Sequence, residues 1–123
     1  MKTMVLIVMI ANAALFFFGA VQHLGVAIGT FHEPRIIPAA VVETTCGIAL
    51  IWGVIALVRR SGWGTAIATN FVALAGVLTG MAALAAGRGP RTASNDLYHH
   101  IMLALIAVSL LLLFYARASA RGR

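Results

Sequence analysis

The side chains in this sequence that are best suited to chemistry are its four histidines and three acids, and some of them interrupt long apolar stretches. His23 and Glu43 are each the single acidic or basic residue of such a stretch, and His99 and His100 lie near the start of another. A carboxylate or imidazole in apolar surroundings is costly unless it is paired, hydrogen-bonded or neutralised. We therefore expect Glu43 to be neutral, to bind a cation or to hydrogen-bond a histidine, with His23 as its natural partner.

An imidazole beside a carboxylate supports two kinds of chemistry. It handles protons and hydrogen-bonds a ligand, and it also ligates Zn, Fe or Cu ions. A metal site would use His23, Glu43 and His99, whereas a haem would need two axial imidazoles, from His23 and from His99 or His100. Successive residues of a helix point about 100° apart, so only one of His99 and His100 is expected to face inward.

Two asparagines are further candidates for a polar site within the apolar stretches. Asn12 precedes His23 by eleven residues, which is almost three helical turns, so the two side chains are expected to share a face. Asn70 lies in the third apolar stretch. Both are expected to point toward other helices rather than toward lipid.

The composition places these residues in a membrane protein. Of the 123 residues, 62% are hydrophobic and 10% are charged, whereas soluble domains are about 45–50% apolar and about 25% charged. The mean hydropathy is +1.00. These values exclude an ordinary soluble enzyme, a disordered chain and a disulfide-rich scaffold. The net charge of +6 does not indicate nucleic-acid binding, because the basic residues stand at the ends of the apolar stretches rather than in one patch.

Four stretches are long enough to cross a bilayer, which needs roughly 20 apolar residues per helix. We expect these helices at about Met4 to Thr30, Ile36 to Val58, Trp63 to Ala86 and Leu97 to Ala116. Proline, glycine and charged residues separate them, and residues 94–96 supply a cap and an acid for the last helix. The sequence predicts an all-α integral membrane four-helix bundle, with residues 1–123 as a single transmembrane domain in contact with the lipid bilayer.

The distribution of basic residues predicts the orientation. Cytoplasmic ends of membrane helices carry an excess of lysine and arginine. Six basic residues gather at the end with both termini: Lys2, Arg59, Arg60, Arg117, Arg121 and Arg123. Three gather at the other end: Arg35, Arg88 and Arg91. We expect a multi-pass protein of the cell membrane with both termini cytoplasmic and with the histidines in its outer half.

Small residues at spacings of three or four mark one face of the third helix. They are Ala66, Asn70, Ala73, Gly76, Gly80, Ala83 and Gly87. Gly25 and Gly29 have a similar spacing at the end of the first stretch. Such patterns allow helices to approach closely, either within the bundle or in a homo-oligomer.

Several segments resemble those of DoxX-like small membrane proteins. Phe18–Leu24, with Gly19 and His23, is similar to a glycine- and histidine-bearing segment of their first helix, although Leu24 stands where an aromatic residue is usual. Residues 34–38 resemble their proline-bearing loop, and residues 43–50 resemble the E-x-x-x-G-L-x-L pattern of their second helix. Arg59 and Arg60 resemble the basic turn that follows, and Asn70 resembles an asparagine of their third helix. The similarity covers Gly19 to Asn70.

This resemblance implies a four-helix membrane protein with a site at His23 and Glu43. Some DoxX-like proteins are linked to quinone-connected sulfur oxidation or to redox-stress complexes. The leading interpretation is a small redox-associated membrane protein that holds a quinone-like or other amphipathic ligand near the outer leaflet. Three alternatives stay open: a non-catalytic subunit of a larger membrane complex, a haem or metal protein, and a small transporter that depends on Glu43.

Overall fold

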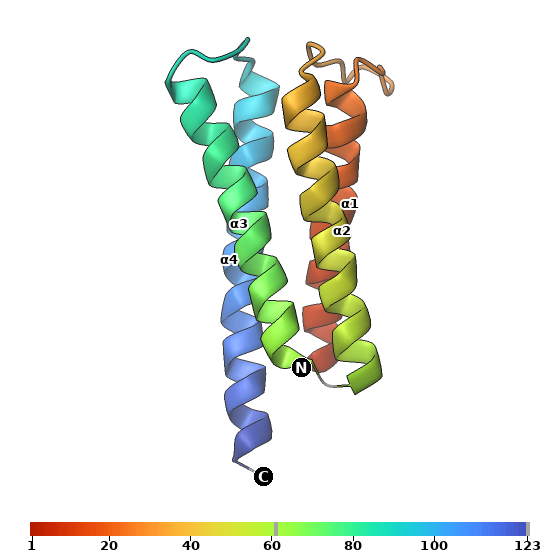
Figure 1. Cartoon of the computed structure of the whole chain (residues 1–123), viewed down its shortest axis with the longest axis vertical. Helices are drawn as coiled ribbons and strands as arrows, with labels where there is room; N and C mark the ends of the chain where they lie inside the picture. The colour runs from red at the N-terminus through yellow and green to blue at the C-terminus, as the bar shows by residue number, and fades with distance from the viewer. Residues whose placement is uncertain (61, 123) are drawn as a thin grey trace.

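The protein is a bundle of four antiparallel helices (Figure 1). The computed structural model describes residues 1–60 and 62–122. The helices are α1 (Lys2–His23), α2 (Ile37–Arg60), α3 (Trp63–Ala85) and α4 (Ala93–Arg121). Helix α1 packs against α2 and α4, and α3 packs against the same two helices, so the four form a ring. Both termini lie at one end, here called the termini end, and residues 24–36 and 86–92 connect helices at the other, the loop end.

The first helix ends seven residues earlier than the sequence predicts, at His23 rather than at Thr30, and it begins at Lys2 rather than at Met4. Gly25 and Gly29 adopt φ values of +89° and +61°, a left-handed conformation that glycine allows and a right-handed helix excludes. Ile28 and Phe31 then exchange two backbone hydrogen bonds of 2.9 and 3.0 Å in a tight turn. The glycine pair therefore shapes a loop, and its predicted role in helix packing is wrong.

The fourth helix is longer than the predicted Leu97–Ala116, since it runs from Ala93 to Arg121. It begins earlier because Thr92 has extended backbone and its Oγ1 accepts a hydrogen bond from the Asn95 backbone N–H at 3.1 Å. This is a standard helix N-cap, and it lies before the predicted cap at residues 94–96. Residues 117–121 continue the helix, as alanine and arginine favour. The predicted bounds of the second and third helices are correct within two residues.

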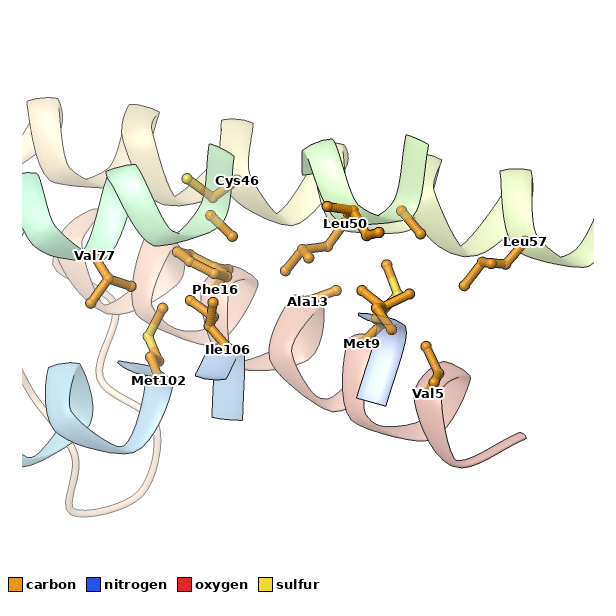
Figure 2. Packing of buried hydrophobic residues seen from close by; sticks show 14 of the residues in the cluster. Val5, Met9, Ala13, Phe16, Cys46, Leu50, Leu57, Val77, Met102 and Ile106 are labelled. Atoms are coloured by element: carbon orange, nitrogen blue, oxygen red, sulfur yellow. The ribbon is translucent and has the colours of Figure 1, made fainter. Parts of the chain in front are cut away.

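Apolar side chains from all four helices fill the centre of the bundle. Phe16, Leu50 and Ile106 belong to one cluster of buried apolar side chains, which Figure 2 shows from close by. Large apolar side chains also cover the outside: Trp52 is 64% exposed and Leu111 is 71% exposed. A soluble protein of this size rarely leaves so much apolar surface in water. All four helices are long and apolar enough to span a membrane, and the chain is a small four-span integral membrane protein whose outer surface contacts lipid.

The small residues of α3 allow its two neighbours to approach. A Cβ atom on Gly76 would overlap the Cys46 sulfur of α2, and one on Gly80 would lie 2.7 Å from Nε2 of His99 on α4. Gly87 belongs to the stripe in sequence only, because it lies beyond α3 with a φ of +69°. The described part of the stripe therefore has a packing role within the chain, between α2 and α4.

Candidate functional site

A buried histidine–glutamate pair links α1 to α2 near the loop end. Nδ1 of His23, the last residue of α1, lies 2.8 Å from Oε2 of Glu43, which is the seventh residue of α2. His23 is 2% exposed and Glu43 is 6% exposed. The direct contact predicted from their similar depth is present. Because a carboxylate only accepts hydrogen bonds, an ionised Glu43 requires the proton on Nδ1 of His23.

Gly19 makes room for a second polar contact beside this pair. Tyr98 of α4 donates its hydroxyl to the backbone carbonyl of Leu15 at 2.8 Å. A Cβ atom on Gly19 would overlap this hydroxyl and would lie 2.7 Å from Oε1 of Glu43. The tyrosine hydroxyl and the second carboxylate oxygen of Glu43 therefore both lie against the bare backbone of α1 at Gly19. Sequence reasoning used Gly19 only as part of a family resemblance.

The two adjacent histidines of α4 have different surroundings, as their positions on a helix require. His99 is buried, and its Nδ1 lies 2.8 Å from the Asn95 carbonyl oxygen. A carbonyl can only accept, so Nδ1 carries a proton and Nε2, which faces Gly80 on α3, has a lone pair when the ring is neutral. His100 is exposed, and its Nδ1 bonds the Asp96 carbonyl at 2.7 Å. His99 is therefore the inward-facing member.

Two cavities flank the His23–Glu43 pair at the loop end. The larger has a volume of about 330 Å³ and lies between α1, α4 and the α1–α2 loop. The smaller, of about 210 Å³, lies between α2, α3 and α4 and contains both Glu43 and His99 in its wall. His23 and Asn95 line both cavities. Ligand sites in proteins are typically about 300–1,000 Å³ and mostly apolar with a few polar groups, and the larger cavity fits that description.

Gln22 lines the larger cavity and has unused hydrogen-bonding capacity in its side chain. Its side chain is buried, at 2% exposure, and it lines the cavity beside His23. Neither Nε2 nor Oε1 of Gln22 has a hydrogen-bond partner among residues 1–60 and 62–122. A buried polar group without a partner costs about 1–3 kcal/mol. The Gln22 carboxamide therefore favours a bound molecule that can accept from its N–H₂ group or donate to its oxygen.

The wall of the larger cavity is tied together by Glu33 of the α1–α2 loop. Its carboxylate accepts hydrogen bonds from Thr92 at 2.8 Å and from Ser94 at 2.5 Å, both at the start of α4. Phe31 of the same loop meets Phe18 of α1 edge to face, with ring centroids 6.0 Å apart. These contacts hold the loop against the end of the bundle, where Phe18, Phe31 and Glu33 line the cavity.

Asn12 and Asn70 lie away from this site. Each is fully buried, but neither lines one of the two cavities. Nδ2 of Asn70 donates to the Ala66 carbonyl of its own helix at 2.9 Å. In the described part of the chain, the carboxamide of Asn12, Oδ1 of Asn70 and Oγ of Ser109 have no hydrogen-bond partner. The candidates that the structure brings together are thus His23, Glu43 and His99, while Asn12, Asn70 and His100 stand apart.

The three residues expected to ligate a metal line the same cavity, but they are not arranged as ligands of one metal ion. His23 and Glu43 bond each other, whereas His99 bonds Asn95. Across residues 1–60 and 62–122, no three histidine, cysteine or acidic side chains are grouped as ligands of one metal ion. Sequence reasoning also missed Gln22 and Tyr98 as cavity residues and treated Asn95 only as a capping residue. The sequence signal for these residues was their position, which predicts a depth in the membrane close to that of His23.

Comparison with known proteins gives no relative from which a function could be transferred. No family model, curated protein or solved structure matches the chain.

Proposed function

We propose that this protein binds a small amphipathic molecule of the quinone type in the larger cavity, at the loop end of the bundle. The observation that carries the proposal is the buried His23–Glu43 pair beside an apolar cavity that is also lined by Gln22, whose buried carboxamide has no hydrogen-bond partner among the described residues. A quinone has an apolar body and two carbonyl oxygens. The apolar lining suits the body, and the side chains of Gln22 and His23 suit the oxygens.

The role of His23 follows from the hydrogen bond to its other nitrogen. With Nδ1 bonded to Glu43, Nε2 is the ring atom left to accept a proton from a ligand hydroxyl or, when the ring is charged, to donate one to a ligand carbonyl. Glu43 stabilises the charged ring and fixes its orientation. The association with redox chemistry rests on the resemblance to DoxX-like proteins, and it remains part of this proposal.

The test is a thermal-shift titration of the detergent-purified protein with decylubiquinone. A ligand that binds only the folded state raises the melting temperature in proportion to the logarithm of its concentration. We expect a rise for the wild type and its loss in Gln22→Leu and Glu43→Gln. Decanol, which has the same chain length but no quinone ring, controls for partition into the detergent.

A matched histidine pair separates binding from folding. His23→Ala leaves Glu43 buried without its partner, so we expect a loss of about 1–3 kcal/mol in the free energy of unfolding and no ligand shift. His100→Ala changes an exposed ring and should leave both quantities as in the wild type. Equal decylubiquinone shifts in the wild type, Gln22→Leu and Glu43→Gln would contradict the proposal. That result would leave the pair as a fastener between α1 and α2, as the subunit alternative requires.

A further inference from the structure

The smaller cavity adjoins the His23–Glu43 pair between α2, α3 and α4, whereas the larger one adjoins it between α1 and α4. Glu43 lines the smaller cavity and does not line the larger one. His23 forms part of both walls. The pair therefore lies between two cavities, and of these two Glu43 lines the smaller one alone.

The smaller cavity has both buried and exposed polar side chains in its mainly apolar wall. They include His99 and Asn95 of α4, Thr79 of α3 and Arg88 of the α3–α4 loop. Arg88 and Thr79 are exposed, whereas His99 and Glu43 are buried. These polar groups offer hydrogen-bond partners to water, and each water molecule needs two to four of them.

We propose that the smaller cavity is a water-filled access route from the loop end to the carboxyl group of Glu43. A ligand in the larger cavity and water in the smaller one then meet the same buried pair from two different cavities. This inference rests on the proposed function only for the occupant of the larger cavity. The route itself is a property of the chain and needs no ligand for its test.

The test uses the water-soluble carbodiimide 1-ethyl-3-(3-dimethylaminopropyl)carbodiimide with glycine methyl ester. The carbodiimide adds to a carboxyl group and activates it. The amine of glycine methyl ester then attacks the activated carbonyl carbon to form an amide, and the carbodiimide leaves as a urea. Peptide mass spectrometry then gives the labelled fraction at each acid. We expect labelling of Glu43 in the folded wild type, with partly exposed Asp96 as an internal reference.

Two groups of variants show whether the reagent reaches Glu43 through the smaller cavity or through the larger one. Ala83→Leu fills the smaller cavity from α3 and Ala39→Leu fills it from α2, so each should lower Glu43 labelling at least tenfold. Leu15→Phe adds volume in the larger cavity and should leave labelling within twofold of the wild type. Labelling of Asp96 should be equal in all of them. Helical circular dichroism and gel filtration confirm that the compared variants are folded, and either filling variant is sufficient.

Two results would overturn the proposal. One is a wild-type protein in which Glu43 reacts only after unfolding. The other is a loss of labelling in Leu15→Phe with none in the filling variants, because access would then run through the larger cavity. Neither result depends on decylubiquinone, so a failure here and a failure of ligand binding remain distinguishable.

Discussion

The absence of one carbon atom at Gly19 allows three helices to meet at the site. The Tyr98 hydroxyl of α4 and Oε1 of Glu43 from α2 both occupy the space that a Cβ atom would need. We expect Gly19→Ala to lower the free energy of unfolding by about 1–3 kcal/mol, the usual cost of overfilling a packed interior. It should also abolish the ligand shift by displacing Tyr98 from Leu15. Thermal unfolding in detergent measures the first effect and the decylubiquinone titration the second.

Gly64→Ala is the matched control for that substitution. Gly64 lies in the first turn of α3 with nothing within 4 Å of its Cβ position. Alanine is a better helix former than glycine by up to about 1 kcal/mol, so this variant should be as stable as the wild type or more stable. Equal stabilities of Gly19→Ala and Gly64→Ala would show that the contacts at Gly19 carry no energy.

The sequence was sufficient to predict the part of the site that follows from the free-energy cost of burying an unpaired acid. A lone glutamate in an apolar helix needs a partner, and His23 was the one ionisable side chain of the first apolar stretch. The parts that depend on three-dimensional packing were not predictable. Gln22 lies beside His23 in sequence. Only the three-dimensional structure shows that it lines the cavity and that its carboxamide has no partner among the described residues. Tyr98 reaches inward to the backbone of α1, a contact that joins residues far apart in the sequence.

The start of α4 depends on Thr92, which acts both as helix cap and as anchor for a loop. Its Oγ1 accepts from the Asn95 N–H and donates to Glu33. We expect Thr92→Ala to cost about 1 kcal/mol through the lost cap and to speed hydrogen exchange in the first turn of α4. Thr45→Ala is the control, because that exposed hydroxyl bonds only the Val41 carbonyl of its own helix. Exchange measured by mass spectrometry should remain slow in the control; slow exchange in Thr92→Ala would contradict the anchoring role.

The close contact between α3 and α4 depends on Gly80. We expect Gly80→Leu to lower the free energy of unfolding by about 1–3 kcal/mol, because its side chain meets the His99 ring. Ala75→Leu introduces the same side chain at an exposed position of α3 and should fold normally. Unfolding curves in detergent for both variants decide the matter. If both variants have the same free energy of unfolding as the wild type, the packing of α3 against α4 does not require a small residue at position 80.

The number of helices followed from the lengths of the apolar stretches. The residues at which the helices begin and end depend on local conformation and capping, which the hydropathy pattern does not reveal. The apolar residues after His23 favoured continuation to Thr30, but the left-handed conformation at Gly25 ends the helix first. Glycine at this position was equally compatible with close packing and with a turn. The cap at Thr92 was likewise one of several suitable hydroxyl or amide side chains, and its bond to Glu33 arises from a loop far away in sequence.

For the whole molecule, the arrangement of helices places all the candidate chemistry at one end. The ring order brings α1, α2 and α4 together at the loop end, where His23, Glu43 and Tyr98 meet. Length and hydropathy were sufficient to predict four spans. They were not sufficient to predict the cavities, which depend on the side chains that several helices and the α1–α2 loop contribute to their walls. The relationship to DoxX-like proteins remains a proposal that rests on short segments of sequence.

The orientation of the molecule is a prediction of its charge distribution, six basic residues at the termini end against three at the loop end. Because translocation of lysine and arginine is disfavoured, the termini end should be cytoplasmic and the His23–Glu43 site should open toward the outside. Cysteines introduced at Gly89 and Gly122, with buried Cys46 replaced by alanine, test this in intact cells with a membrane-impermeant maleimide. Gly89→Cys should react at once and Gly122→Cys only after the cells are permeabilised. The reverse pattern would place both cavities on the cytoplasmic side and would require any ligand to approach from there.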